Sequence, residues 1–304
     1  MRTVHAWGRF LNAFLNATKP KIERLPSGAV TPRIGLALGG GFARGVAHAG
    51  ILRAFERQGI PIHCIAGVSA GSIVAAAYAS GANAEEIGRA GCAMRFGDVA
   101  RWSICRMGFV VSERMKHFLE GLLKNYRFEE MRIPLGVVAT DLRSGEAVSF
   151  HGKGDVFLPI RASCSYPGLF QPVRVGNQLL VDGAMSTEIP AVLARQMGAT
   201  HVVSVHLPVL PGDRVPTNMF QVVNRCFQIM QTHNEASWRA ASDLVIAPDV
   251  STVQWDGFEC GAQMLEAGEA AAMAAIPRIR EWLAPVPMRL SDNRRRVLPE
   301  VAAS

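Results

Sequence analysis

The sequence predicts an α/β protein with a mostly parallel central sheet and helices on both faces. An apolar run at residues 34–38 precedes a glycine turn and a helix over 46–58. A second apolar run at 62–66 precedes a sharp turn and a helix over 70–79. Strands buried on both faces are apolar throughout rather than alternating. Such strands in alternation with helices are typical of a parallel sheet between helical layers.

The later elements follow from the same patterns. The stretch from 85 to 130 is amphipathic and is predicted to be helical. Strands are expected to resume at 133–140 and, after a Gly176-Asn177 turn, at 179–181. The remaining predicted elements are a strand at 201–206, a helix around 220–241, a strand at 244–247 and a helix over 261–283.

One main domain over residues 31–284 accounts for most of the 304 residues, because neither a repeat nor a low-complexity linker divides them. Residues 1–30 are expected to form an amphipathic helical extension, with apolar side chains at helical spacing and basic residues beside them. That helix either packs on the main domain or lies in a membrane interface. Residues 285–304 form a tail with three consecutive arginines, a candidate second basic contact.

A net charge of +7 favours anionic partners, such as a membrane surface with acidic lipids. Nucleic acid is not expected, because the basic residues are dispersed and no nucleic-acid-binding module is recognisable. The six cysteines include no Cys-x-x-Cys pair and no histidine at metal spacing, so no metal site is expected and a reducing compartment is indicated.

The charge-free stretch 60–84 is long enough to suggest a membrane span, but its glycines, serines and alanines make it weakly apolar. The N-terminus lacks the apolar core of a signal peptide. We therefore expect a cytoplasmic protein, free or bound peripherally to a membrane surface.

A glycine-rich motif at residues 39–45 lies between the first strand and its helix. A dinucleotide site is disfavoured, because Arg44 stands where its fingerprint needs glycine and no acidic residue ends the next strand. Glycine turns bring backbone N–H groups close to an anion at a helix N-terminus. The backbone N–H groups of Gly40, Gly41 and Phe42 are therefore predicted to form an oxyanion hole.

The motif Gly67-Val68-Ser69-Ala70-Gly71 follows the second strand and opens a helix. This is the context of a nucleophile elbow, in which small neighbours allow a strained serine between strand and helix. Ser69 is the predicted nucleophile, with Gly67 and Gly71 as the elbow glycines.

A serine hydroxyl needs an adjacent base, and Asp182 in Asp182-Gly183-Ala184 follows a predicted strand where it can supply one. A Ser-His-Asp triad is the alternative, with His206 the best-placed histidine. Only about two strands precede Ser69, whereas the ordinary α/β-hydrolase fold has several, so the triad is disfavoured. His48 is expected to be a structural hydrogen-bonding residue.

The three motifs in this order resemble the patatin-like phospholipase family, especially its bacterial branch similar to the catalytic domain of neuropathy target esterase. Similar sequence continues through 44–48, 139–142 and 166–172, and the likeness spans about residues 34–249. The resemblance implies a three-layer α/β/α sandwich and a Ser69–Asp182 dyad without a catalytic histidine. It also implies an oxyanion hole at Gly40, Gly41 and Phe42, and a dyad glycine at Gly183. Arg44 would orient the loop or contact phosphate. Phe42 departs from the family pattern, in which many members carry another glycine.

The expected activity is hydrolysis of phospholipid or lysophospholipid esters through an acyl-enzyme, without a metal or organic cofactor. A thioesterase or acyltransferase, or a non-catalytic membrane-binding regulator on the same scaffold, are the alternatives. Oligomeric state and lipid preference are left open. Candidates to line an acyl groove, or else to fill the core, are Met107, Phe109, Met115 and Phe118.

Overall fold

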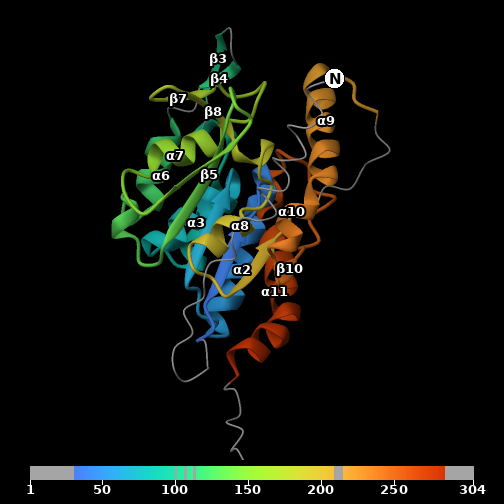
Figure 1. Cartoon of the computed structure of the whole chain (residues 1–304). Coiled ribbons are helices and arrows are strands. Elements are labelled where there is room, and N and C mark those ends of the chain that lie inside the picture. Colours follow the sequence, from blue (N-terminus) through green and yellow to red (C-terminus); the bar gives the residue numbers. More distant parts are fainter. Residues whose placement is uncertain (1–30, 100, 106–107, 112–113, 209–214, 285–304) are drawn as a thin grey trace, which may run out of the picture.

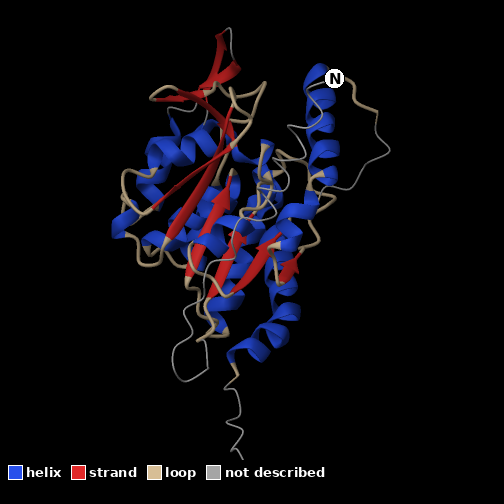
Figure 2. Ribbon diagram, viewed as in Figure 1, coloured by secondary structure: helices blue, strands red, loops and turns tan. Residues whose placement is uncertain are grey.

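A central sheet lies between helices on both of its faces in the computed structural model (Figures 1 and 2). The structure describes residues 31–99, 101–105, 108–111, 114–208 and 215–284. The predicted three-layer α/β/α architecture is thereby confirmed. The proposed N-terminal extension (1–30) and basic tail (285–304) lie outside the described residues.

The main sheet has eight strands in the order β10-β9-β1-β2-β5-β8-β7, with β6 also paired to β5. The five strands from β10 to β5 in this order are all parallel, whereas β6, β7 and β8 pair antiparallel with their neighbours, so the sheet as a whole is mostly parallel. The strands are β1 (Ile34–Leu38), β2 (Cys64–Val68), β5 (Leu135–Asp141), β6 (Ala147–His151), β7 (Val173–Val175), β8 (Gln178–Asp182), β9 (His201–Val205) and β10 (Leu244–Ile246).

The two faces of the sheet pack against different helices because side chains alternate along each strand. Leu36 and Leu38 of β1 share one core with helices α2, α3, α4 and α11, whereas Ala37 between them belongs to a second core with α8 and α10. The helices are α2 (Val46–Arg57), α3 (Ala70–Ser80), α4 (Ala84–Ala93), α5 (Phe96–Val99), α6 (Arg114–Leu122), α7 (Phe157–Ser163), α8 (Ala191–Gln196), α9 (Met219–His233), α10 (Glu235–Ala240) and α11 (Gly261–Leu283). Short 3-10 turns are η1 (Phe42–Gly45), η2 (Phe128–Glu130), η3 (Gly183–Met185) and η4 (Phe258–Cys260).

The prediction of continuous helix from 85 to 130 is wrong in its middle. There the chain forms an antiparallel hairpin of β3 (Arg101–Cys105) and β4 (Gly108–Val111). β-branched and aromatic residues in both runs favour strand over helix. The short elements β6, β7, α7 and α8 had no predicted counterpart, because runs of three to seven residues carry too little periodicity to detect.

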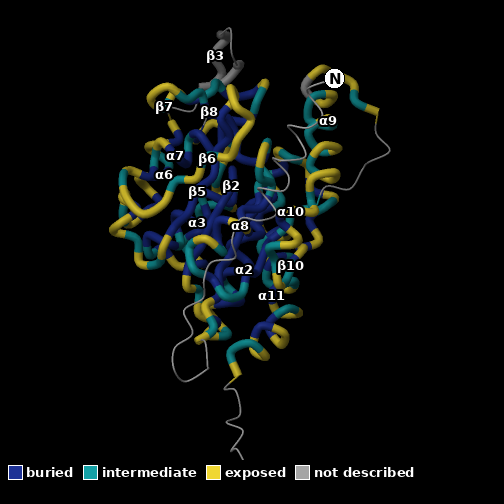
Figure 3. The backbone as a smooth tube through the Cα atoms, viewed as in Figure 1, coloured by how far each residue is buried: buried dark blue, intermediate teal, exposed yellow. Residues whose placement is uncertain are grey.

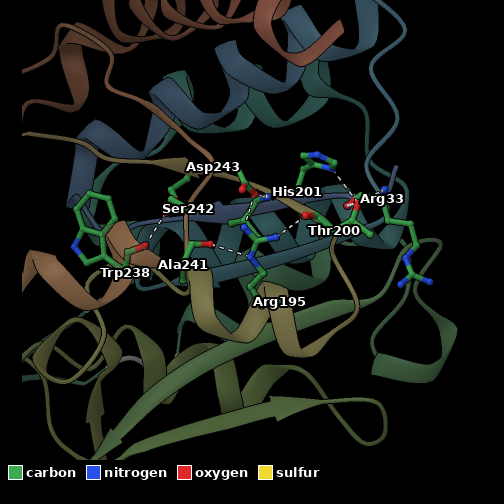
Figure 4. A network of polar contacts seen from close by, with 10 residues as sticks. Arg33, Arg195, Thr200, His201, Trp238, Ala241, Ser242 and Asp243 are labelled. Atoms are coloured by element: carbon green, nitrogen blue, oxygen red, sulfur yellow. Dashed lines mark hydrogen bonds and ion pairs between the residues drawn. The ribbon is translucent and has the colours of Figure 1, made fainter. Parts of the chain in front are cut away.

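A polar network far from the glycine turn joins α8 to the edge of the sheet (Figure 4). The Arg195 guanidinium donates to the carbonyls of Thr200, at 2.6 Å, and Ala241, at 3.1 Å, and it also pairs with Asp243. The same Asp243 carboxylate accepts the Val202 N–H of β9 at 2.6 Å. One arginine and one aspartate thus hold the ends of α8, β9 and β10 together.

Within the described ranges, no helix combines the length and the apolar character needed to cross a bilayer. The five cysteines whose side chains are described are free thiols.

Candidate active site

Ser69 lies in a sharp turn between β2 and α3. Its φ of 52° is in the left-handed region, and among the described non-glycine residues only Phe42 shares that feature. The Ser69 N–H donates to the Ser163 hydroxyl at 2.9 Å, and that hydroxyl donates to the Val138 carbonyl at 2.6 Å. The Ser69 carbonyl accepts from the N–H and the hydroxyl of Ser72. Both backbone groups of the strained residue are therefore satisfied, which holds it in place.

Glycines make this turn possible. A Cβ added at Gly67 would lie 2.3 Å from the Gly71 carbonyl oxygen, and one added at Gly71 would lie 2.4 Å from the Leu38 carbonyl oxygen. At Gly183 an added Cβ would lie 2.2 Å from the Val138 carbonyl oxygen. All three predicted glycines thus stand where backbones approach too closely for any side chain.

Strand β5 brings Ser69 and Asp182 together although 112 residues separate them in the sequence. Val68, the last residue of β2, pairs with Val138 of β5. The next residue of β5, Ala139, pairs on its other side with Asp182, the last residue of β8. Val68 and Asp182 consequently flank adjacent positions of β5, Ser69 directly follows Val68, and Ser69 and Asp182 both line one cavity.

The Asp182 carboxyl is 1% exposed, and its Oδ1 accepts the Ala184 N–H at 2.9 Å. Its buried Oδ2 has no partner with full hydrogen-bond geometry in the described part of the chain. Burial raises the pKa of Asp182 from the ordinary 3.8 to about 7, and the Ala184 N–H and the nearby Ser69 side chain lower it by less. Burial without a full set of partners, beside a serine that lines the same cavity, gives this carboxyl a pKa suited to accepting a proton near neutral pH.

The glycine loop passes directly over Ser69. A Cβ added at Gly40 would lie 3.3 Å from the Ser69 Cβ. The flanking N–H groups are occupied, since that of Gly39 donates to Val205 and that of Ala43 donates to Trp255. Among the described residues, none accepts a hydrogen bond from the N–H groups of Gly40, Gly41 or Phe42. These three donors remain available to a developing oxyanion.

His48 of α2 holds the glycine loop through a hydrogen bond. Its side chain is fully buried, and Nε2 lies 2.9 Å from the Gly39 carbonyl oxygen. Burial lowers the pKa of His48 to about 4, against a smaller opposing effect of this hydrogen bond, so the ring is neutral and Nε2–H donates. In a trans peptide, C=O and N–H point in opposite directions. Holding the Gly39 carbonyl toward α2 therefore turns the Gly40 N–H away from the helix.

Arg44 is 5% exposed, and its guanidinium donates to the Gly41 carbonyl at 3.4 Å and to the Pro208 carbonyl at 3.5 Å. Burial lowers the pKa of Arg44 to about 10. These contacts join Arg44 to the glycine loop and to Pro208, and Arg44 also borders the cavity.

Phe42, at a φ of 50°, packs its ring on Tyr166 and Trp255 with centroids 4.9 and 5.3 Å away. The left-handed backbone explains why glycine would also suit this position.

A cavity of about 270 Å³ unites these groups. The glycine loop, Ser69, Asp182 and Arg44 line one side, and polar residues of α9 line another. A neighbouring cavity of about 630 Å³ shares Ala184, Glu188 and Gln231 with it. Sequence reasoning missed the contribution of α9, because no local pattern shows which helix will cover a loop distant in sequence.

His206, Glu188 and Glu235 also border this cavity, and in the described chain they form the one group with metal-ligand spacing. Protein donors already engage both carboxylates. Glu188 accepts from Trp238 at 3.1 Å and lies 3.2 Å from His206 Nε2, and Glu235 accepts from Arg239 at 2.6 Å. These partners account for the cluster without an ion. His206 therefore pairs with Glu188, the residue that sequence reasoning did not single out.

The groove residues proposed from the sequence do not border the Ser69 cavity where their side chains are described. Met115 is buried in the core, and Phe118 packs on that core beside a separate pocket. The helical spacing of these residues predicts an apolar face. It does not distinguish a face that packs in the core from a face that lines a lipid groove. The side chains of Met107 and Phe109 lie outside the described residues.

The family model of patatin-like phospholipases matches residues 36–195 of this chain. An uncharacterised NTE family protein of Mycobacterium tuberculosis is 32% identical over 183 residues, covering 59% of this chain and 50% of the relative. A second such protein of that species is 30% identical over 270 residues, covering 80% and 46%. The chain thus spans about half the length of these relatives.

Two further likenesses extend the comparison. A protein of Mycosarcoma maydis named lysophospholipase NTE1 is 33% identical over 227 residues, which cover 71% of this chain and 12% of that protein. Among solved structures, VipD from Legionella pneumophila superposes with a TM-score of 0.57 at 14% identity, covering 84% of this chain and 69% of VipD. At 14% identity, this structural similarity shows that VipD and this chain share a fold.

Proposed function

Because this chain belongs to the patatin-like phospholipase family, we propose that it is a serine lipid acyl hydrolase with Ser69 as nucleophile and Asp182 as base. One observation carries the proposal. A single cavity is lined by a strained serine, by a buried carboxylate with a pKa near neutrality, and by a loop with three unengaged backbone N–H groups. Nucleophile, base and oxyanion donors are the three parts that acyl transfer requires.

In the proposed reaction, Asp182 accepts the Ser69 proton while the serine oxygen bonds to the ester carbonyl carbon. The N–H groups of Gly40, Gly41 and Phe42 stabilise the resulting oxyanion. The tetrahedral species collapses, the bond to the alcohol breaks, and the alcohol leaves with the proton from Asp182. Water then gives a proton to Asp182 and attacks the acyl-enzyme, which releases the fatty acid and restores the Ser69 hydroxyl.

The proposed substrate is a phospholipid or lysophospholipid, the class named for the family and for the fungal relative. The neighbouring 630 Å³ cavity, which reaches the site at Ala184, is a place for an acyl chain. The mechanism uses no cofactor. A lipid substrate and the net charge of +7 together favour work at an anionic membrane surface.

Four proteins test the dyad: wild type, Ser69→Ala, Asp182→Asn and His206→Gln. Turnover of a soluble short-chain ester should fall by about 10⁴-fold or more in the first two variants, because each removes a member of a unit that acts together. His206→Gln should retain turnover within about tenfold, because Asp182 and not His206 takes the proton. Labelling by a fluorophosphonate should disappear in Ser69→Ala.

His206→Gln is the matched control, since this residue borders the same cavity. If it were as inactive as Asp182→Asn, a histidine-based triad would replace the dyad. An active Ser69→Ala protein would remove the nucleophile from the scheme. Unfolding temperatures of all four proteins separate loss of chemistry from loss of fold.

An acyltransferase or thioesterase would use the same three parts. Adding an alcohol acceptor or replacing the ester by a thioester, and comparing the products with those formed in water alone, distinguishes these activities from hydrolysis. A non-catalytic regulator would fail to react with the fluorophosphonate.

A further inference from the structure

The end of helix α7 contacts both members of the proposed dyad. Helix α7 packs on strands β5 and β8, and it ends at Ser163. We call residues 163–165, the last residue of the helix and the two that follow, the α7 turn. Each of these three residues contacts either the turn that carries Ser69 or the backbone of Asp182. None of them was singled out by the sequence patterns.

The contacts of the α7 turn with the nucleophile reach its backbone. The Ser163 hydroxyl accepts the Ser69 N–H at 2.9 Å and donates to the Val138 carbonyl of β5 at 2.6 Å. Cys164 Sγ lies 3.8 Å from the Ser72 hydroxyl, which in turn donates to the Ser69 carbonyl at 2.6 Å. The Ser163 hydroxyl thus uses both its acceptor and its donor to tie the serine turn to β5.

The contact of the α7 turn with the proposed base is also to its backbone. The Asp182 N–H donates to the Ser165 carbonyl at 2.9 Å. The Ser165 hydroxyl donates to the Arg161 carbonyl at 2.8 Å, which fixes the α7 turn against its own helix. Only one residue separates Ser163 from Ser165. The backbones of the nucleophile and of the base are therefore held from nearly the same point.

Strand pairing alone does not fix the position of Ser69. The ladder between β2 and β5 ends at Val68, one residue before Ser69. Ser69 has a φ of 52°, and a residue other than glycine keeps such a backbone only where its surroundings enforce it. Ser163 is fully buried, as are β2 and β5 along their whole length (Figure 3), so bulk water does not reach this contact. The Ser163 hydroxyl is thus one of the groups that enforce the strained turn.

We propose that Ser163 is a positioning residue whose hydroxyl fixes the Ser69 turn relative to Asp182. This inference rests on the proposed hydrolase function, because Ser163 acts through the proposed nucleophile. Without the hydroxyl, the Ser69 N–H loses its partner and the Val68–Ser69 peptide is free to rotate, which moves the serine oxygen relative to the carboxylate. A displacement of about 1 Å between reacting groups can lower a rate about 100-fold.

Three variants test this role. Ser163→Ala removes the hydroxyl, and Ser163→Thr retains it. Ser80→Ala is the matched control, because Ser80 is also a buried serine that links two backbone groups. Its hydroxyl accepts the Lys124 N–H at 3.0 Å and donates to the Ala77 carbonyl at 2.7 Å. Ser80 lies at the opposite end of α3 from Ser69, so the control loses similar hydrogen bonds away from the site.

Hydrolysis of a soluble short-chain ester should show kcat lowered about 10- to 100-fold in Ser163→Ala, with KM within about threefold of wild type, because the walls of the cavity are unchanged. Phosphonylation of Ser69 by a fluorophosphonate should slow by a similar factor. Ser163→Thr should recover most of the loss. Ser80→Ala should keep the wild-type kcat, and the unfolding temperatures of all the variants show what each substitution costs the fold.

A wild-type kcat in Ser163→Ala would overturn the inference. So would an equal loss of kcat in Ser163→Ala and Ser80→Ala, or in Ser163→Ala and a Ser163→Thr protein that unfolds at the wild-type temperature. Failure of the proposed hydrolysis would appear separately, as a wild-type protein with neither ester turnover nor fluorophosphonate labelling.

Hydrogen exchange tests the contact itself without catalysis. Amide exchange in residues 65–72, measured by mass spectrometry, should be faster in Ser163→Ala than in wild type, because the Ser69 N–H has lost its acceptor. It should be unchanged in Ser80→Ala. Equal exchange of this segment in Ser163→Ala and wild type would show that the hydroxyl does not hold the turn, whatever reaction the protein catalyses.

Discussion

At the scale of single residues, the burial of Asp182 governs how the site responds to pH. The proposed base works only when it is ionised, and its pKa is raised to about 7. We expect kcat/KM for a soluble ester to rise with pH through about 7 and to level off above it, following one ionisation. A profile that stays flat from about pH 5 to about pH 9 would contradict Asp182 as base.

The same burial affects stability with a definite sign. The folded pKa lies above the ordinary 3.8, so the fold favours the neutral carboxyl. Its contribution to stability is fully present below about pH 4 and is lost as pH rises through about 7. Asp182→Asn should therefore be inactive and yet more stable than wild type at about pH 8, by at most about 4 kcal/mol for three pKa units. At about pH 4 the two proteins should have equal free energies of unfolding, as measured by urea denaturation. If Asp182→Asn were more stable than wild type by the same amount at both pH values, ionisation of Asp182 would not be the source of the difference.

At the scale of elements, α2 supports the glycine loop through His48. Removing that donor frees the Gly39–Gly40 peptide to rotate, which moves the Gly40 N–H away from the oxyanion. We expect His48→Leu to lower kcat about 10- to 100-fold with little change in KM, since the contact matters most in the transition state. His48→Gln, whose amide can reach the same carbonyl, should recover most of this loss.

The comparison of the two His48 variants separates positioning from mere support of the fold. If Leu and Gln lower kcat equally and lower the unfolding temperature equally, His48 is only a packing residue. Phosphonylation by a fluorophosphonate should follow kcat across the series, because its transition state needs the same N–H groups.

At the scale of the whole molecule, the sequence predicts the parts of the fold with strong local patterns. The two strand–turn–helix units around Ser69 appear within about two residues of their expected bounds, because apolar runs and glycine turns are local signals. The β3–β4 hairpin and strands β6 and β7 were missed, since runs of three to five residues carry too little periodicity to distinguish strand from helix or loop. The nucleophile elbow needs only its own residues to be recognised, but the wall supplied by α9 is set by tertiary packing.

The part of the chain before the described residues has its own prediction. Residues 1–24 carry five basic residues and an apolar stripe at helical spacing. Deleting them should weaken binding to anionic vesicles and reduce its salt dependence, because fewer charges meet the surface. Hydrolysis of a soluble short ester should be unchanged. Vesicle binding equal to that of the full chain would exclude this segment from membrane contact.

Strand β5 links the Ser69 and Asp182 sides of the site, and this has a consequence for the protein during its synthesis. A growing chain can form β1, β2 and the serine turn early, but residue 182 is made more than a hundred residues later and must add antiparallel to β5. Until then Ser69 lacks the aspartate that we propose as its base. On the proposed mechanism, an unfinished chain is therefore inactive, and activity arises only once β8 has paired with β5.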